Sequence, residues 1–217
     1  GHANVSNKSI DALIDDLTDE LEPRKPLPHP VVRTFPWAVI SFTYLAVIIQ
    51  VSGLRPDLVH EFHDVNFIFE LGLSIFIAVS AFLASAYWCV PDARGKKWLV
   101  SLPLMGSSIF IFWNAIRFII EENARMPDLH WNHCYKDGLA MAILPIASIV
   151  IMCRQGKTTC SATMMSMNII AITSVAYIGL RFTCMLDTVG HSGIAHILPF
   201  SIVATIMGFA THRLYKW

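Results

Sequence analysis

Six apolar runs, most of them near or above 18 residues long, recur along the chain and leave few folds open to it. An α-helix of about 20 residues crosses the hydrocarbon core of a bilayer, which is about 30 Å thick. The composition agrees, because 54% of the 217 residues are hydrophobic and only 15% are charged. Soluble domains carry about a quarter charged residues. The chain is therefore predicted to be an all-α polytopic membrane protein.

The apolar windows predict six transmembrane helices joined by short segments. They are expected at about residues 36–53, 65–88, 99–119, 137–153, 162–182 and 193–210. No second folded domain fits between them. The first run lacks a cleavage-like site, so no signal peptide is expected. We therefore expect a cytoplasmic segment over residues 1–35 and a membrane domain over residues 36–217.

Lysine and arginine residues gather on one side of these spans. Three lie in the opposite loops, Arg55, Arg125 and Lys136, whereas eleven lie on the side of the amino terminus: Lys8, Arg24, Lys25, Arg33, Arg94, Lys96, Lys97, Arg154, Lys157, Arg213 and Lys216. Cytoplasmic loops of membrane proteins are enriched in these residues. Both termini are therefore expected in the cytoplasm.

The segment ahead of the first span reads as an acidic amphipathic helix over about residues 9–22. Its apolar residues recur at spacings of three and four, which places them on one stripe of a helix: Ile10, Leu13, Ile14, Leu17 and Leu21. Acidic residues cover much of the remaining surface, namely Asp15, Asp16, Asp19 and Glu20. Pro23 is expected to end this helix. The following "PRKPLPHP" is expected to be an extended spacer.

A helix of about 13 residues is marginal alone in water, so its apolar stripe must bury against something. It could lie on the membrane surface, but anionic lipids would repel its acidic face. It could also fold onto the basic cytoplasmic loops of its own chain. The favoured interpretation is a helix-in-groove contact with a separate cytoplasmic protein. Its acidic face would speed the encounter and its apolar stripe would supply affinity.

The few ionisable residues of the spans lie in the outer third of the membrane. Charges there are costly and usually pair with one another or face the bundle interior. We expect Glu70 to pair with Arg117 or Arg181. The alternative for the two arginines is that they extend to the lipid headgroups.

Two cysteines are expected on the oxidising side of the membrane. Cys134 opens the fourth span and Cys184 ends the fifth, so the two could approach each other. A disulfide, two free thiols, and a metal or redox site all remain open, and the possible further ligands are His133, Asp187, His191 and His196. Their spacing matches no established zinc signature, which favours a structural tie between helix ends over a redox- or metal-responsive site. Cys153 and Cys160 read as ordinary small residues at cytoplasmic helix ends.

Two other classes of protein, a membrane thiol-redox protein and a transporter, fit the sequence less well than a binding protein. A membrane thiol-redox protein would also place cysteines at the outer rim, but no CxxC pair occurs. A transporter of small solutes or metal ions tends to carry acids or broken helices near the midplane, where this chain is apolar. We also find no nucleophile–base set, Gly-rich phosphate loop or HExxH, so an enzyme is not expected.

A series of short motifs, taken in order, resembles the NrsF family. The series begins with "LIDDLTDELEPRKPL" and continues with "GLRPDL", "VPDARGKKW", Cys134, Leu144-Pro145, "LRFTCMLDTVGHSGIAHILP" and the tail "HRLYKW". The Cys–Asp–His–His series within Leu180–Pro199 is its most specific element. The chain departs from the family at Ala195, where we expect tryptophan, and in the tail, where lysine replaces arginine.

The resemblance implies a six-helix inner-membrane anti-sigma factor for an extracytoplasmic-function sigma factor of the sigma-F kind. It implies that the amino-terminal segment sequesters the sigma factor and that the protein itself does not bind nucleic acid. It further implies that Cys134 and Cys184 connect an outside stress to release, through a disulfide or a bound metal ion, with no other cofactor expected.

Overall fold

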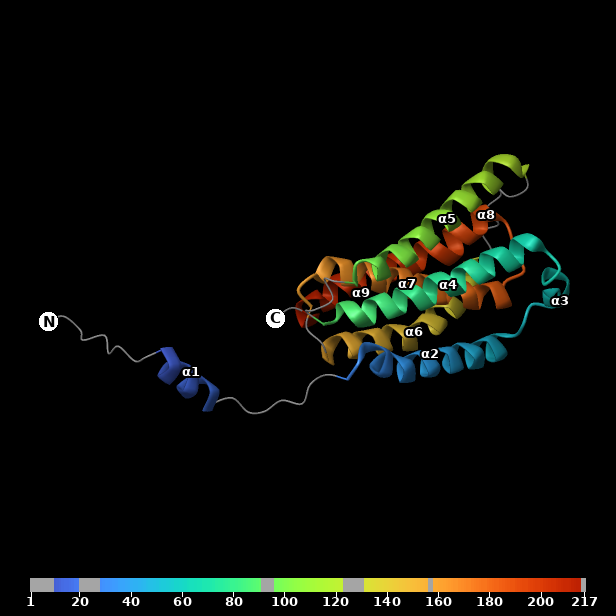
Figure 1. The fold of residues 1–217 in the computed structure, drawn as a ribbon. Helices are drawn as coiled ribbons and strands as arrows, with labels where there is room; N and C mark the ends of the chain where they lie inside the picture. Colours follow the sequence, from blue (N-terminus) through green and yellow to red (C-terminus); the bar gives the residue numbers. More distant parts are fainter. Residues whose placement is uncertain (1–9, 20–27, 91–95, 123–130, 156–157, 216–217) are drawn as a thin grey trace.

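The computed structural model describes residues 10–19, 28–90, 96–122, 131–155 and 158–215 (Figure 1). Within these ranges every regular element is helical and no strand occurs. The predicted all-α class is therefore confirmed.

Six helices of the described chain are long and apolar enough to cross a membrane. Five are single elements, and the sixth is a composite run of three consecutive elements. The bounds are α2 Pro30–Ser52, α4 Val65–Trp88, α5 Trp98–Ile120, α6 Trp131–Gln155, α7 Ser161–Thr183, and then α8 Val189–His191, the π-helix η3 Ser192–Ile197 and α9 Leu198–Tyr215. The short helix α3 (Leu58–Glu61) lies between α2 and α4. The six predicted spans are thus confirmed.

Two helices begin about two turns earlier than their hydropathy predicts. Helix α2 starts at Pro30 rather than at residue 36, so the last residue of the predicted spacer is helical. Proline suits the first turn because it has no N–H to leave unsatisfied, and the His29 ring accepts a hydrogen bond from the Val31 N–H at 3.4 Å. Helix α6 starts at Trp131 rather than at residue 137. Its first residues are polar, so a hydropathy window does not register them.

Helices α4 and α7 form the centre of the bundle. Of the apolar span of α7, 67% is buried, and of α4 50%, whereas α2 and α5 bury only 17% each. Close packing of α6 on its neighbours depends on glycine. A Cβ built on Gly138 of α6 would lie 2.1 Å from the Phe200 ring of α9, and one on Gly179 of α7 would lie 2.2 Å from Met141 Sδ of α6. Small residues at such contacts let helices approach closely in membranes.

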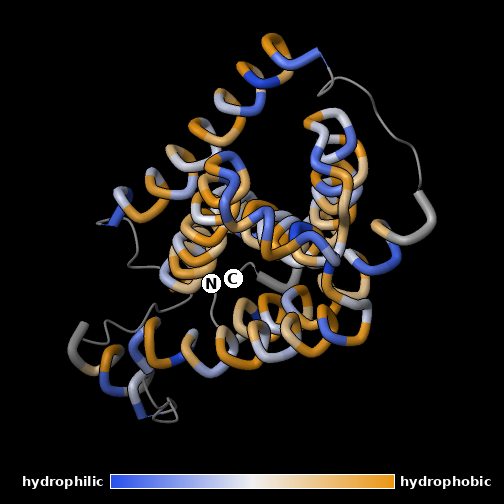
Figure 2. The backbone as a smooth tube through the Cα atoms, turned by 90° about the vertical axis from the view of Figure 1, so that its right-hand side faces the viewer, coloured by the Kyte–Doolittle hydropathy of each residue, from blue (hydrophilic) through white to orange (hydrophobic). Residues whose placement is uncertain are grey.

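The outer surface of the bundle is apolar, which fits a hydrocarbon environment. Large apolar side chains more than 60% exposed include Phe35, Val51, Ile111, Phe112 and Phe209. Figure 2 shows apolar colours over much of the length of the helices. Soluble proteins rarely expose continuous apolar surface on this scale.

The two ends of the bundle differ in what they carry. We call the end that holds Pro30 and Tyr215 the proximal end, and the end that holds Gly53, Glu121 and Cys184 the distal end (Figure 1). Helix α1 (Ile10–Asp19) takes part in none of the principal contacts between helices and is drawn apart from the bundle on the proximal side.

Candidate functional site

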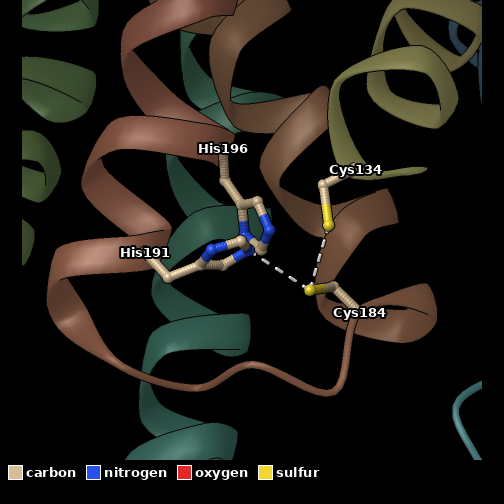
Figure 3. A group of neighbouring side chains, drawn as sticks. All are labelled: Cys134, Cys184, His191 and His196. Carbon is tan, nitrogen blue, oxygen red and sulfur yellow. Dashed lines mark hydrogen bonds between the residues drawn. The ribbon is translucent and has the colours of Figure 1, made fainter. Parts of the chain in front are cut away.

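Four sulfur- and imidazole-bearing side chains meet at the distal end, and we call them the Cys–His cluster (Figure 3). Cys134 lies in the first turns of α6, Cys184 caps the end of α7, His191 ends α8 and His196 lies in η3. The two Sγ atoms are 3.2 Å apart, and Cys184 Sγ lies 3.5 Å from His191 Nε2. All four side chains are buried. The ends of three spanning helices therefore converge on one thiol pair.

The π-helix η3 brings the two histidines together. In a regular α-helix of 3.6 residues per turn, residues five apart point about 140° away from each other. The wider π turn, with its i→i+5 hydrogen bonds, reduces this divergence. The rings of His191 and His196 consequently stack edge to face with centroids 4.9 Å apart. Isolated π turns inside helices occur frequently at functional sites.

The chemistry of the Cys–His cluster suits both a metal ion and thiol redox reactions. One ligand atom from each residue can be chosen so that all four lie within 4.8 Å of one another. Two thiolates and two imidazoles form a tetrahedral donor set of the kind that binds Zn²⁺. The His196 ring is completely buried, and neither of its nitrogens has a hydrogen-bond partner among the described residues. A nitrogen of this ring is therefore available to bind a metal ion.

The cysteines of the cluster are free thiols in this structure. The hydrogen bond from Cys134, and then the nearby rings of His191 and His196, lower the pKa of Cys184 below the ordinary thiol value, against the opposing effect of burial. A lowered pKa favours the thiolate, which is the form that binds metals and attacks oxidants.

Asp187, a further predicted ligand, does not join the Cys–His cluster. Asp187 instead lies against arginines, as described below. His133 belongs to α6, but its side chain lies outside the described part of the structure.

Glu70 of α4 lies in a buried ion-pair network next to the Cys–His cluster. Its side chain is 2% exposed. Arg117 Nη1 of α5 donates to Glu70 Oε1 at 2.5 Å, and the Tyr177 hydroxyl of α7 donates to Oε2 at 2.9 Å. Arg181 Nη2 of α7 lies 3.6 Å from the same Oε2. The structure thus places Glu70 between both predicted arginine partners, and neither arginine extends alone to the headgroups.

Asp187 links this network to a second arginine at the distal end. It accepts hydrogen bonds from Arg181 and, at 2.9 Å, from Arg55 Nη1. Arg55 also donates to Asp57 at 2.7 Å, and its side chain is fully buried. These hydrogen bonds keep the pKa of Arg55 above its ordinary value, although burial opposes the charge. From the sequence alone, Arg55 is assigned to a loop, and Tyr177 is not identified as a member of this network.

The network and the Cys–His cluster are in contact. Asp187 follows Cys184 by three residues in the segment that joins α7 to α8. The Tyr177 ring, which binds Glu70, lies edge to face with the His196 ring at 6.2 Å between centroids. A displacement of Cys184 or His196 would therefore reach the ion pairs that join α4, α5 and α7.

Helix α1 carries the predicted partner-binding stripe. Ile14 is 52% exposed, and Asp15 and Asp19 are exposed beside it. The backbone of Ile10, Leu13, Asp16 and Leu17 is helical, whereas their side chains, and the residues Glu20 and Leu21, lie outside the described part.

Six membrane-length helices with a buried thiol–imidazole cluster at one end define a multi-pass membrane protein. The family model NrsF, negative regulator of sigma F, matches residues 17–217. The chain therefore belongs to the NrsF family, and it is a negative regulator of a sigma factor. Comparisons with curated proteins and with solved structures found no match.

Proposed function

We propose that the chain is an anti-sigma factor of the bacterial inner membrane, with both termini in the cytoplasm. In this proposal α1 and the residues up to Leu21 sequester an extracytoplasmic-function sigma factor. The bundle releases it when a periplasmic or membrane signal acts on Cys134 and Cys184. The observation that carries the proposal is the NrsF match over residues 17–217, taken together with an amphipathic helix that has no principal contact with the described bundle.

The orientation is supported by the charges at the two ends. Lys96, Lys97 and Arg154 are among the basic residues of the proximal end. At the distal end the described arginines form ion pairs with carboxylates, as Arg55 does with Asp57 and Asp187. A free basic end faces the cytoplasm in most membrane proteins. Helix α1 would then share a compartment with soluble sigma factors.

The contact with the sigma factor rests on the two faces of α1. The support from the structure is Ile14, the one stripe residue whose side chain is described, which is exposed. An amphipathic helix with such a stripe binds by laying it into an apolar groove. The acidic face, which includes Asp15 and Asp19, suits a basic surface such as those with which sigma factors contact promoters and polymerase.

The test of the contact is co-purification with the sigma factor from detergent extracts. Replacing Leu13→Asp and Leu17→Asp together puts two charges on the apolar stripe, so the sigma factor should be lost from the complex. The control Ala12→Asp adds a charge to the opposite face of the helix and should leave capture intact. An unchanged yield with the double variant would rule out binding through the stripe.

The proposed sensing step has two possible chemistries at the Cys–His cluster. A metal ion would be held by Cys134, Cys184, His191 and His196, which supply a fitting tetrahedral donor set. Alternatively, an electrophilic oxidant such as a peroxide would take two electrons from the thiols. Cys134 and Cys184 would then lose two protons and form one S–S bond.

Either event would draw α6 and α7 together at their distal ends. For release to follow, the two arrangements of the bundle must bind the sigma factor with different affinities. A tenfold difference corresponds to about 1.4 kcal/mol.

Serine substitutions test the role of the cluster. Cys134→Ser or Cys184→Ser should abolish stress-dependent release, measured from a promoter that the sigma factor drives. The control Cys160→Ser removes a thiol near the proximal end and should respond like the wild type. Intact protein mass and metal content of the stressed protein then separate the disulfide from the metal ion. A normal response by both distal variants would leave these cysteines a purely structural role.

A further inference from the structure

Three sulfur atoms meet at the proximal end, far from the Cys–His cluster. Cys89 caps the end of α4, Cys153 lies near the end of α6 and Met164 lies in the first turn of α7. Cys89 Sγ is 3.1 Å from Cys153 Sγ and 3.5 Å from Met164 Sδ. All three side chains are completely buried. We call this group the proximal sulfur site. From the sequence alone Cys153 is expected to be an ordinary small residue, because its neighbours in this site come from other helices.

A buried positive charge accompanies the proximal sulfur site. Arg33 of α2 is 7% exposed, and its one side-chain hydrogen bond within the described residues runs from Nη2 to the Ala86 carbonyl at 2.9 Å. Its Nε and Nη1 atoms are buried and have no partner among the described residues. Its acceptor Ala86 lies three residues before Cys89 in α4, which places the guanidinium near the site. An isolated buried cation is costly, and among the described residues no anion forms a hydrogen bond with this guanidinium.

Polar side chains around Cys153 are arranged to support a thiolate. The amide of Asn168 donates to Cys153 Sγ at 3.8 Å, and the Ser85 hydroxyl lies at the same distance from it. The Ser85 hydroxyl donates its proton to Asn168 Oδ1, which orients the Asn168 amide so that its N–H points at the sulfur. A donor to a sulfur ligand orients it and stabilises its charged form in metal sites.

We propose that the proximal sulfur site binds one thiophilic monovalent cation of the Cu(I) class, held by Cys89, Cys153 and Met164. Thiolate and thioether ligands select Cu(I) over harder ions. The net charge of the occupied site is zero, because two thiolates and one monovalent cation leave a single negative charge, which Arg33 neutralises. On binding, two S–H bonds break, three metal–sulfur bonds form (two from the thiolates and one from the thioether) and two protons pass to solvent. The cation undergoes no change in oxidation state.

Two other occupants fit the site less well. Zn²⁺ takes four nitrogen, sulfur or oxygen ligands and rarely uses a thioether, and with two thiolates it would leave Arg33 uncompensated. A Cys89–Cys153 disulfide is neutral, so it too would leave the buried guanidinium without an anion. It would also make no use of Met164.

The experiment uses the full chain, purified in detergent with Cys134→Ser and Cys184→Ser so that the Cys–His cluster cannot contribute. Cu(I) is supplied without oxygen, in competition with a chromophoric Cu(I) chelator. We expect one tightly bound equivalent, with sulfur-only ligation by X-ray absorption. Adding Cys89→Ser should weaken binding at least tenfold. The matched control, Cys160→Ser, removes a nearby thiol that lies outside the site and should leave the affinity unchanged.

A second variant guards against loss of fold. Met164→Leu keeps the volume and the apolar character of the side chain but removes the thioether, so it should weaken Cu(I) binding with the helical circular dichroism unchanged. The proposal is overturned if the starting protein binds no Cu(I), or if Cys89→Ser binds it equally well. It is also overturned if Zn²⁺ displaces Cu(I), or if the protein is isolated under argon with a Cys89–Cys153 disulfide. None of these measurements involves the sigma factor, so their failure is distinct from failure of the proposed function.

Discussion

Glu70 is a carboxylate in the buried part of a membrane bundle, and its surroundings explain how the fold tolerates it. Arg117 and Tyr177 donate to its two oxygens, and Arg181 lies next to them. A buried ion pair adds little compared with a well-packed apolar pair, but removing one partner leaves an uncompensated charge. Glu70 therefore holds three helices in a defined arrangement, and its loss should be felt in all of them.

Replacing Glu70→Ala should lower the free energy of unfolding by about 3–5 kcal/mol, because the buried Arg181 and the partly buried Arg117 lose their shared anion. Unfolding of the purified protein in mixed micelles measures this loss. The control is Glu121→Ala. That carboxylate also binds Arg117 but is 41% exposed, so its loss should cost less than about 1 kcal/mol. Equal effects of the two variants would show that the inner ion pair has no special role.

Among the elements, the contact of α6 with α9 depends on one glycine. A Cβ on Gly138 would lie 2.1 Å from the ring of the fully buried Phe200. Gly138 is also one helical turn from Cys134, so a change in this contact would move the thiol. An aromatic ring surrounded by core atoms cannot shift freely.

Gly138→Ala should consequently destabilise the bundle by about 1–3 kcal/mol, as overpacked cores do. The same substitution at Gly72 of α4 is the control, because a Cβ there would meet nothing within 4 Å. Alanine is the better helix former, so Gly72→Ala should be neutral or slightly stabilising. Thermal unfolding of both variants provides the comparison, and adding Phe200→Leu should recover part of the stability that Gly138→Ala loses.

Hydropathy located the part of each helix that lies in an apolar environment, and for α4 both predicted ends agree with the structure. It could not locate polar turns that continue a helix, which is why the starts of α2 and α6 were predicted too late. The approach of Cys134 to Cys184 was anticipated from antiparallel neighbours. The place of His196 was not derivable, because it depends on a π turn that no periodicity reveals. Arg33 and Cys89 were missed because their partners are distant in sequence.

At the scale of the whole molecule, the two ends of the bundle should lie in different compartments. Cysteine labelling with a membrane-impermeant maleimide tests this in a variant that lacks the native cysteines. A cysteine at Asp15 should react only after the cells are lysed. A cysteine at Val59, which is 77% exposed at the distal end, should react in intact cells. Labelling of residue 15 from outside would contradict the proposed sequestration of a cytoplasmic partner.

Helices α6 and α7 share a feature that joins both ends. At the distal end of this antiparallel pair Cys134 of α6 faces Cys184 of α7. At the proximal end Cys89 of α4 contacts both Cys153 of α6 and Met164 of α7. Between them Gly179 holds the two backbones at close range. This antiparallel pair therefore has a group of sulfur ligands near each of its ends. In the proposed orientation, a cation bound at the proximal sulfur site would limit how far α6 and α7 can separate at the distal end, so cation binding inside the cell would set how strongly the Cys–His cluster responds to events outside it.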